Sequence, residues 1–508
     1  MMVTDHNCEY LGLSRLCLME SAGKSLAEEV GKIAVYTFSK PVKVVIFTGS
    51  GGNGGDGFVA ARYLLNRGYD VDIYMLKDNI HSRDAKTNLE ILFNMKPRLS
   101  RLNIFNLKTL EDIDNCEVAK SKDSEFIIVD GLLGTGIKGN LQTNIRRAIE
   151  IINESKGIKI SVDVPSGMDP LTGEIDDLAV VPDYTISFHK IKTGVRDAEE
   201  ELVGGLVTAD IGIPIEAEYF VNYGDFLRLE NRNPKSHKGN NGKLLIVGGN
   251  KDFAGAPAIA GMASIGAGAD LVYVCAPEKV AEAIKSTSPD LIVKSLDGDK
   301  LSLDHADEIL KAAQDVDAVL IGPGSGIDEE TSKLFNVLVA KVKKPIVLDA
   351  DALKQVEISL IKARDDVILT PHISEFKSIF NVSGDLKLDI DSYDFAKVDD
   401  NITEFHQITR QIEGTVVIKG QYDLILSKTK FKINRSGNAG MTVGGTGDAL
   451  SGIATGLLSQ GLNAFDSASL AAFINGLAGD AAFEDKGNGF SATDLVSYIG
   501  NVIKNGLC

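Results

Sequence analysis

The chain has 508 residues and a formal net charge of −18. Because one hydrophobic core rarely serves more than about 300 residues, this length predicts two domains. The acidic balance argues against nucleic-acid binding, and no apolar run reaches the ~20 residues that span a bilayer. Five scattered cysteines, without a Cys-x-x-Cys pair, argue against a zinc site or a disulfide framework. We expect a cytoplasmic protein that binds neither nucleic acid nor membrane.

In the first half of the chain, apolar runs typical of buried strands alternate with helical patterns. This alternation indicates a parallel sheet covered by helices on both faces. The expected strands are Val42–Thr48, Phe126–Asp130, Lys159–Val164 and Tyr184–Phe188, and the expected helices are Val59–Asn66 and Gln142–Asn153.

The pattern lapses between Pro214 and Asn240, so the seam between the domains is expected there. A new strand begins at Lys243, and the alternation resumes. The expected strands are Leu271–Ala276, Ala318–Ile321, Pro345–Leu348, Val367–Leu369 and Thr415–Ile418, and the most continuous helices are Asp448–Ser459 and Ala464–Glu484. We therefore expect two α/β domains, at residues 1–215 and 225–508.

Polar loops follow three strands of the first half. A glycine-rich segment at 49–57, with Asn53 and Asp56 in it, leads into a helix, an arrangement that binds phosphate groups. Asp130 ends the next strand, and Asp163 and Ser166 follow the third. Oxygen atoms of Asn53, Asp130 and Ser166 could converge on a hard cation. The alternative is that the glycines form a turn without a ligand and that Asp130 and Asp163 only cap a helix or a turn.

The second half carries a stronger signal at residues 439–448. A glycine-rich segment there leads into a helix, so its backbone N–H groups and the helix dipole favour an anion, and Asp448 stands beside that hole. An anion hole next to a carboxylate indicates phosphoryl transfer to an alcohol. Because a helix N-terminus stabilises a carboxylate, we expect Asp448 to position the hydroxyl at least as much as to remove its proton.

Further polar motifs end four other strands of the second half: Gly322–Gly326, Asp349 with Asp351, His372 with Glu375, and Lys419–Asp423. Ligands of open α/β sheets bind at this edge. For His372 the alternative is a purely structural hydrogen-bonded role, and Asp349 and Asp351 could simply cap the following helix.

Several first-half motifs together resemble the NAD(P)HX epimerase domain: Leu18 to Gly23, Asn53 to Gly57, Asp130 to Gly134, and Asp163 to Gly167. The resemblance implies a K⁺ ion held by Asn53, Asp130 and Ser166, with Asp163 and Lys192 as catalytic residues. It implies that the hydrated nucleotide is bound by Gly52, Asn53, Gly54, Gly55, Asp56, Gly134, Thr135, Gly136, Ile137, Lys138, Gly139, Asn140 and Asp163. Gly52 departs from the family pattern, which has asparagine there.

The second half resembles the ribokinase-like fold and, through Thr370 to Glu375 and Asn438 to Asp448, the ADP-dependent NAD(P)HX dehydratase. The resemblance implies that Ala256, Gly324, His372 and Asp448 face the hydrated dinucleotide, with Asp448 catalytic. The implied nucleotide site consists of Lys419, Gly420, Gln421, Tyr422, Asp423, Asn438, Ala439, Gly440, Met441, Thr442, Val443, Gly444, Gly445, Thr446 and Gly447. The phosphoryl donor is expected to be ADP, or else ATP, accompanied by Mg²⁺.

The predicted fold is thus two three-layer α/β/α domains, Rossmann-like at the N-terminus and ribokinase-like at the C-terminus. The predicted function is epimerisation of R- and S-NADHX and NADPHX by the first domain. The second would dehydrate the S epimer to NAD(P)H, giving AMP and phosphate. The alternatives are a kinase of a small hydroxylated metabolite and a dinucleotide-binding protein with one inactive half. We expect a homo-oligomer.

Overall fold

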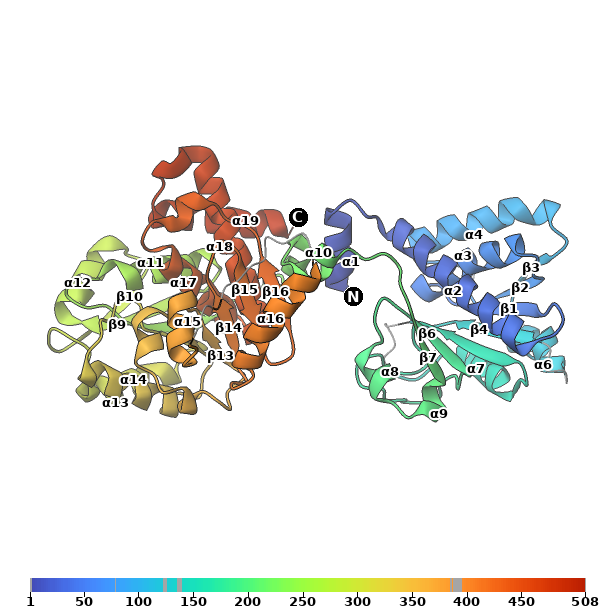
Figure 1. Ribbon diagram of the computed structural model, residues 1–508, viewed down its shortest axis with the longest axis horizontal. Coiled ribbons are helices and arrows are strands. Elements are labelled where there is room, and N and C mark those ends of the chain that lie inside the picture. Colours follow the sequence, from blue (N-terminus) through green and yellow to red (C-terminus); the bar gives the residue numbers. More distant parts are fainter. Residues whose placement is uncertain are drawn as a thin grey trace. The chain divides into compact units, whose positions relative to one another are not determined.

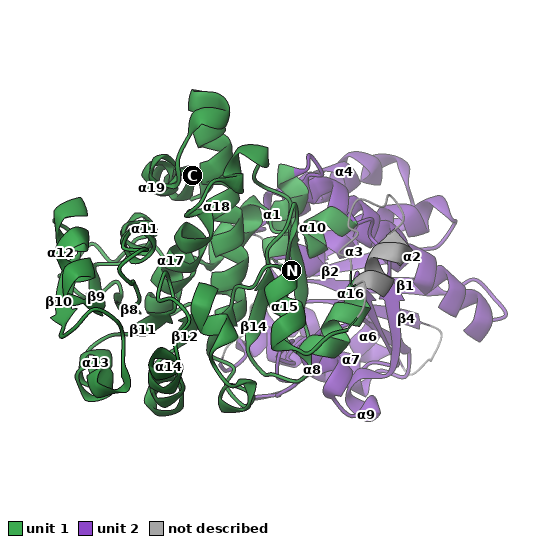
Figure 2. Ribbon diagram, turned by 60° about the vertical axis from the view of Figure 1, so that its left-hand side comes forward, with its two compact units in different colours: residues 1–10, 215–508 green, residues 11–214 purple. Residues whose placement is uncertain are grey.

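The computed structural model describes residues 2–77, 79–121, 126–134, 139–383, 386 and 395–507. The chain forms two compact units, each built on its own sheet (Figures 1 and 2). Unit 2 comprises Leu11–Pro214, and unit 1 joins Met1–Tyr10 to Ile215–Cys508. The expected division at 1–215 and 225–508 therefore needs a correction, because the first ten residues belong with the C-terminal part of the chain.

Unit 2 contains a seven-stranded sheet in the order β3-β2-β1-β4-β5-β6-β7, and all of its pairings are parallel. The strands are β1 (Lys43–Thr48), β2 (Val71–Met75), β3 (Leu102–Asn106), β4 (Phe126–Gly131), β5 (Ile158–Val162), β6 (Tyr184–Phe188) and β7 (Gly205–Ala209). The α-helices are α2 (Arg15–Thr37), α3 (Gly52–Asn66), α4 (Arg83–Met95), α5 (Leu110–Asp114), α6 (Glu117–Lys120), α7 (Thr143–Glu154), α8 (Thr193–Asp197) and α9 (Glu200–Val203).

Unit 1 contains a nine-stranded sheet in the order β10-β9-β8-β11-β12-β13-β14-β15-β16, of which β15 and β16 are antiparallel to their neighbours. The strands are β8 (Lys243–Val247), β9 (Leu271–Pro277), β10 (Ile292–Leu296), β11 (Ala318–Ile321), β12 (Ile346–Leu348), β13 (Val367–Leu369), β14 (Thr415–Ile418), β15 (Asp423–Leu426) and β16 (Phe431–Asn434).

Helices cover both faces of the unit 1 sheet and form two separate hydrophobic cores with it. The α-helices are α1 (Met2–Tyr10), α10 (Ile215–Tyr219), α11 (Gly255–Gly266), α12 (Glu278–Thr287), α13 (Ala306–Gln314), α14 (Glu329–Lys341), α15 (Ile373–Ile379), α16 (Phe395–Thr409), α17 (Thr446–Ser459), α18 (Ala464–Lys486) and α19 (Ala492–Gly506). Residues of α11, α17, α18 and α19 share one core, and residues of α13, α14 and α15 share the other. The predicted fold class, layered α/β in both halves, is confirmed.

Each sheet reverses its strand order once, between β1 and β4 in unit 2 and between β8 and β11 in unit 1. Chains that leave two such strands turn in opposite directions, which opens a crevice at their carboxyl ends. The glycine-rich segment after β1 and the loop after β4 therefore face one crevice. The loops after β8 and β11 face the other.

The glycine-rich segment of unit 2 is helical where a loop was expected. Helix α3 begins at Gly52, whereas the apolar pattern predicts a start at Val59. The first turn of α3 packs so closely on neighbouring backbone that a side chain would not fit there: a Cβ on Gly54 would lie 2.5 Å from the carbonyl oxygen of Gly49. Glycine has no Cβ and therefore permits the early start. Apolar periodicity cannot show such a helix start, since the residues that form it have almost no side chains.

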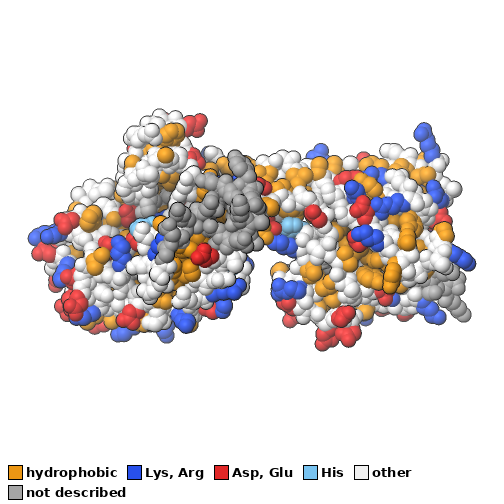
Figure 3. All heavy atoms as spheres, viewed as in Figure 1, with side chains coloured by type: hydrophobic (Ala, Val, Ile, Leu, Met, Phe, Trp, Pro, Cys, Tyr) orange, Lys and Arg blue, Asp and Glu red, His pale blue; other side chains and the backbone are white. Residues whose placement is uncertain are grey.

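On the face drawn in Figure 3, acidic and basic side chains are interspersed. Among the helices that the structure describes, none combines the length and the apolar character needed to cross a bilayer.

Candidate active sites

Unit 2 has a cavity of about 480 Å³ at the carboxyl ends of β1 and β4. It is lined by the start of α3 and by the segments that follow β4. Five residues predicted from the sequence line it: Gly52, Asn53, Gly134, Gly139 and Asn140. The predicted residues Thr135, Gly136, Ile137 and Lys138 lie outside the described part of the chain.

Beneath this cavity, Asp130 is fully buried at the end of β4 and accepts several hydrogen bonds. Its Oδ1 accepts from Ser166 Oγ at 2.6 Å, and its Oδ2 accepts from Ser166 N and Ser161 Oγ, each at 2.9 Å. Burial raises the pKa of Asp130, although the hydrogen bonds from Ser166 and Ser161 oppose that shift. Asp130 and Ser166, predicted as partners from separate strands, are thus in direct contact.

Asn53 joins the same cluster through its side-chain amide. Its Nδ2 donates to the carbonyl oxygens of Val162, at 2.6 Å, and Leu133, at 3.1 Å. Leu133 in turn donates its N–H to Ser166 Oγ at 2.9 Å. The structure therefore brings Asn53, Asp130 and Ser166 together among backbone carbonyl oxygens, although Asp130 reaches Asn53 only through Leu133 and Ser166.

Asp163 directly follows β5 and forms an ion pair with Lys192. Its Oδ1 also accepts a hydrogen bond from Phe188 N at 3.0 Å, and both charged side chains are largely buried. The backbone of Asp163 has φ of +66°, a left-handed conformation that costs a non-glycine residue energy and is concentrated at functional sites. The pairing of the two residues predicted to be catalytic is present in the fold.

Asp56, in the second turn of α3, lies close to this pair but does not line the cavity. Burial, assisted by the charge of Asp163 and opposed by Lys192, raises the pKa of Asp56 well above its ordinary range. Gly54 and Gly55 are buried too and are absent from the cavity lining. These three predicted residues are therefore buried in α3 and do not line the cavity.

Unit 1 has a cavity of about 800 Å³ next to the N-terminus of α17. Most residues predicted to bind the nucleotide line it: Lys419, Gly420, Gln421, Tyr422, Asp423, Asn438, Ala439, Met441, Thr442, Thr446 and Gly447. Gly440, Val443, Gly444 and Gly445 belong to the same segment without lining the cavity. Burial raises the pKa of Asp423, which accepts from Asn434 Nδ2 at 3.0 Å.

Seven cavity-lining residues escaped the sequence analysis: Arg435, Ser436, Gly437, Leu450, Ala472, Asn475 and Gly476. Arg435 and Ser436 directly follow β16, and Asn475 and Gly476 lie within α18. The short strand before Arg435 could have indicated the first pair, since polar residues at a strand end are the signal used elsewhere. The α18 residues carry no such signal, because a helix this apolar predicts core packing.

Asp448 lies in the first turn of α17, next to Gly447 of the cavity. Burial, reinforced by the negative charge of Asp349, raises its pKa to about 7, although Lys419 opposes the shift. The sequence led us to expect a carboxylate weakened as a base by the helix dipole, and the direction is the opposite. The cause is desolvation together with a neighbouring carboxylate, which comes from the end of β12.

Lys419 connects the carboxylates of this site. Its Nζ lies 3.2 Å from Asp349 Oδ1, and Asp349 also accepts from Thr370 Oγ1 at 2.7 Å. Burial alone would lower the pKa of Lys419, but Asp349, Glu375 and Asp448 together raise it. Asp349 therefore participates in the site's charge balance and does not merely cap a helix.

His372 has a structural role in this conformation. It is the N-cap of α15, and its Nδ1 accepts from the backbone N–H groups of Ser374 and Glu375 at 3.2 and 3.3 Å. Its backbone forms a parallel bridge with Lys419, so the residue lies at the strand ends next to Lys419. The side chain is half exposed, which leaves it accessible to a ligand.

Ala256 and Gly324 meet at the reversal between β8 and β11. A Cβ on Gly324 would lie 3.0 Å from the Cβ of Ala256 and 2.7 Å from the carbonyl oxygen of Phe253. With φ of +59°, Gly324 also adopts a backbone conformation that favours glycine. The predicted pair is therefore adjacent in the fold.

Comparisons with known proteins agree with this arrangement. The family profile described as "YjeF-related protein N-terminus" matches residues 15–194, and the profile described as "NAD(P)H-hydrate dehydratase" matches residues 244–501. A bifunctional NAD(P)H-hydrate repair enzyme of Methanothermobacter thermautotrophicus is 44% identical over 511 residues, covering 100% of this chain and 95% of the relative. The corresponding enzyme of Archaeoglobus fulgidus is 40% identical over 507 residues, with 99% and 97% covered.

A solved structure of the ADP/ATP-dependent NAD(P)H-hydrate dehydratase from Bacillus subtilis, co-crystallised with ATP and Mg²⁺, is also similar. It is 23% identical, covers 57% of this chain and 98% of its own, and has a TM-score of 0.46.

The fold is that of a two-domain α/β protein with a cavity at the strand ends of each unit. The matches over the whole chain make the assignment specific: the chain belongs to the family of bifunctional NAD(P)H-hydrate repair enzymes. The predicted function, epimerase and dehydratase on one chain, is confirmed at this level, and a metabolite kinase is not favoured.

Proposed function

We propose that unit 1 dehydrates S-NAD(P)HX to NAD(P)H at the expense of ADP, giving AMP and phosphate, with Asp448 as the catalytic residue. The observation that carries this proposal is the position of the 800 Å³ cavity, which is lined by Thr446 and Gly447, directly before Asp448. A nucleotide in the cavity would place its terminal phosphate at the start of α17, where backbone N–H groups and the helix dipole favour an anion.

The proposed chemistry has two stages. Asp448 accepts the proton of the substrate hydroxyl, the hydroxyl oxygen bonds to the β-phosphorus of ADP, and the bond to the α-phosphate breaks to release AMP. The neighbouring ring nitrogen then donates its electron pair, the C–O bond breaks to release phosphate, and loss of a proton from the adjacent carbon restores the double bond. A carboxyl with a pKa of about 7 is suited to the first proton transfer at neutral pH.

Mg²⁺ would screen the charge of the transferred phosphate. Among the described residues no group of three or more His, Cys, Asp or Glu could hold a metal ion. This fits an ion that arrives with the phosphates of the nucleotide and takes only single contacts from the protein.

In unit 2 we propose that the pair of Asp163 and Lys192 donates a proton to the hydroxyl of NAD(P)HX, which then leaves as water. The pair takes the proton back when water adds again, and because water can add to either face, the two epimers interconvert. The ion pair lies beside the cavity that Asn53 and Gly134 line. For K⁺ we propose Asn53, Asp130 and Ser166 as ligands. The fit rests on their oxygen-rich surroundings, which include the carbonyls of Leu133 and Val162.

The test is absorbance at 340 nm, which reports NAD(P)H, on mixing the protein with both epimers of NADHX, Mg²⁺, K⁺ and either ADP or ATP. Full recovery with a nucleotide supports both activities, and the faster nucleotide decides the donor. Recovery that stops once one epimer is consumed contradicts the proposed role of unit 2. Lys419→Met serves as the site control, because it removes a partly buried cation that lines the cavity and should abolish recovery. Normal turnover by this variant would contradict the proposed nucleotide site.

A further inference from the structure

The N-terminal helix α1 packs on unit 1, although unit 2 follows it in the sequence (Figure 1). Asn7 and Cys8 are completely buried, and the ring of Tyr10 lies 4.6 Å from that of Tyr223. A helix of nine residues has little stability of its own, so these contacts hold it in place. Residues 2–10 are therefore a structural part of the dehydratase unit.

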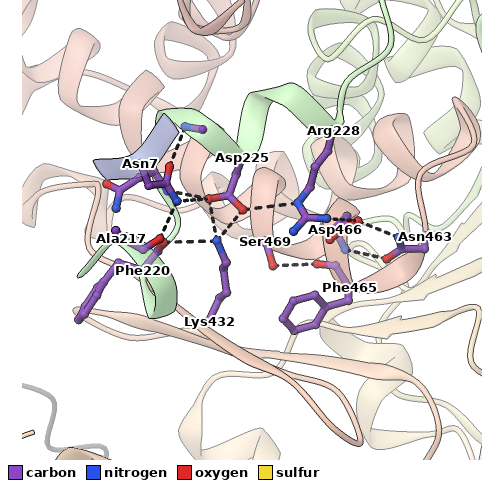
Figure 4. A network of polar contacts seen from close by, with 12 residues as sticks. Asn7, Ala217, Phe220, Asp225, Arg228, Lys432, Asn463, Phe465, Asp466 and Ser469 are labelled. Carbon is purple, nitrogen blue, oxygen red and sulfur yellow. Dashed lines mark hydrogen bonds and ion pairs between the residues drawn. The ribbon is translucent and has the colours of Figure 1, made fainter. Parts of the chain in front are cut away.

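Asn7 binds the segment at the start of the continuous part of unit 1 (Figure 4). Its Nδ2 donates to the carbonyl oxygen of Ala217 at 3.0 Å, and its Oδ1 accepts from Gly224 N at 2.8 Å. The fit is tight, since a Cβ on Gly224 would lie 2.5 Å from Asn7 Oδ1. One side chain of α1 thus clamps both ends of the segment 217–224.

The clamped segment continues into a buried ion pair with β16. Asp225, 1% exposed, lies with its Oδ2 3.4 Å from Asn7 Nδ2, and both of its oxygens accept from Lys432 Nζ, at 2.6 and 2.7 Å. Figure 4 shows Asn7 and Lys432 approaching Asp225, with Arg228 on its other side. Buried charges need such complete pairing, because a group left alone there is strongly unfavourable.

From β16 the contacts reach the nucleotide cavity. Val221 N donates to the carbonyl oxygen of Ile433 at 2.9 Å, which adds the segment to the edge of the sheet. The ring of Phe220 lies 3.8 Å from the guanidinium of Arg435, the first residue after β16. Arg435 and Asn438 line the cavity. An unbroken series of contacts therefore leads from α1 to the cavity wall.

We infer that Asn7 is a positioning residue of the dehydratase, which holds β16 and Arg435 in the geometry that binds the adenine nucleotide. This inference rests on the proposed nucleotide site. It reverses the expectation from sequence order, in which a residue that precedes the epimerase unit would serve the epimerase.

The test is Asn7→Ala in the full chain, with both activities measured on the same preparation. We expect the KM for the nucleotide to rise about threefold to tenfold, with a smaller change in kcat and an unchanged epimerase rate. Asn336→Ala is the matched control, because Asn336 also bridges backbone groups of unit 1 but does so at α14, away from β16. It should lower the melting temperature of unit 1 without raising that KM.

Hydrogen exchange gives an independent readout. In Asn7→Ala, amide exchange of residues 431–438 should accelerate while that of β3 in unit 2 stays the same. If Asn7→Ala does not fold, Tyr10→Ala removes only a ring that is 57% exposed and should raise the KM about twofold. An unchanged KM with unchanged exchange, or a loss of epimerase activity instead, overturns the inference. Lys419→Met is measured in parallel: if it binds nucleotide normally, the proposed site is wrong, and the exchange of 431–438 still reports on α1.

Discussion

The carboxyl groups of Asp163 in unit 2 and Asp448 in unit 1 lie in opposite electrostatic environments. In unit 2, Asp163 is bound by the ammonium of Lys192 and by a backbone N–H. In unit 1, the nearby lysine, Lys419, pairs with Asp349, and no hydrogen bond to the Asp448 carboxyl is found among the residues that the structure describes. Burial and Asp349 raise the pKa of Asp448 to about 7.

Each environment suits the reaction proposed for its unit. A carboxylate held by a fixed counter-charge can pass a proton back and forth without leaving its place, as epimerisation needs. A carboxyl that is poorly solvated and close to another negative charge takes up a proton readily at neutral pH, as activation of a hydroxyl needs. The comparison predicts that the two activities can be separated by single substitutions.

The largest effect is expected for Asp448→Asn. The amide cannot accept the substrate proton, so the dehydratase kcat should fall by about a thousandfold, within the usual range for loss of a general base. Epimerase activity, followed by interconversion of R- and S-NADHX on chromatography, should stay within twofold of the original. Loss of both activities in a folded variant would show that the sites are not independent.

A smaller effect is expected for Lys192→Met. It leaves Asp163 largely buried without its counter-charge, so the epimerase rate should fall about tenfold to a hundredfold while dehydration of pure S-NADHX continues. Lys32→Met is the control, because Lys32 pairs with Glu29 on the surface of α2. Equal losses for the two lysine variants would contradict a catalytic role for Lys192.

The pH dependence of the dehydratase sharpens the comparison further. Because Asp448 must be ionised to accept a proton, kcat/KM should fall about tenfold per pH unit below pH 7. The residual activity of Asp448→Asn should lack this decline. A rate that is flat between pH 5 and 8 in the unmodified protein would argue against Asp448 as the base.

Stability should respond to the same group with the opposite trend. The pKa of Asp448 in the folded state lies above the ordinary value of about 4, so the folded state binds the proton more tightly than the unfolded chain does. The resulting contribution to the free energy of unfolding is present at low pH and is lost as the pH rises from about 4 to 7. Asp448→Asn should therefore melt a few degrees above the original protein at pH 8 and at the same temperature at pH 4. Calorimetry of unit 1 at the two pH values measures the difference.

The smallest effect is expected for Gly52→Asn, which restores the residue usual in the family resembled by unit 2. A Cβ at Gly52 would meet nothing within 4 Å, so the new side chain fits at the cavity wall. We expect the epimerase KM to fall about twofold to fivefold through one added hydrogen bond. Val35→Asn, at an exposed position of α2 that does not line the cavity, is the control and should leave the KM unchanged.

Several of the buried strands and their polar ends could be predicted from the sequence because local signals define them. Continuous apolar runs located β1, β4 and β11, and the residues after strand ends located Asn53, Asp130 and Lys419. Strands β2, β3, β7, β10, β15 and β16 were missed. Most side chains of β3 and β10 are not buried, so their apolar signal is weak. Strands β2, β15 and β16 are buried but have only four or five residues, and such short runs do not stand out from their surroundings.

The environment of Asp448 and the place of α1 could not be predicted. The pKa of Asp448 depends on Asp349, a residue 99 positions earlier that only the sheet order brings close. Asn7 meets Ala217, 210 positions away, through single hydrogen bonds that leave no periodic trace. Contacts of this kind arise from tertiary packing, on which local patterns carry no information.

The discontinuity of unit 1 has a consequence for folding during synthesis. Unit 2 is complete once residue 214 has left the ribosome, and as a contiguous domain it can fold at once. Helix α1 is made before unit 2, but Lys432, which completes the ion pair beside Asn7, is synthesised more than 400 residues later. A helix that is made before unit 2 therefore reaches its final contacts long after unit 2 can fold.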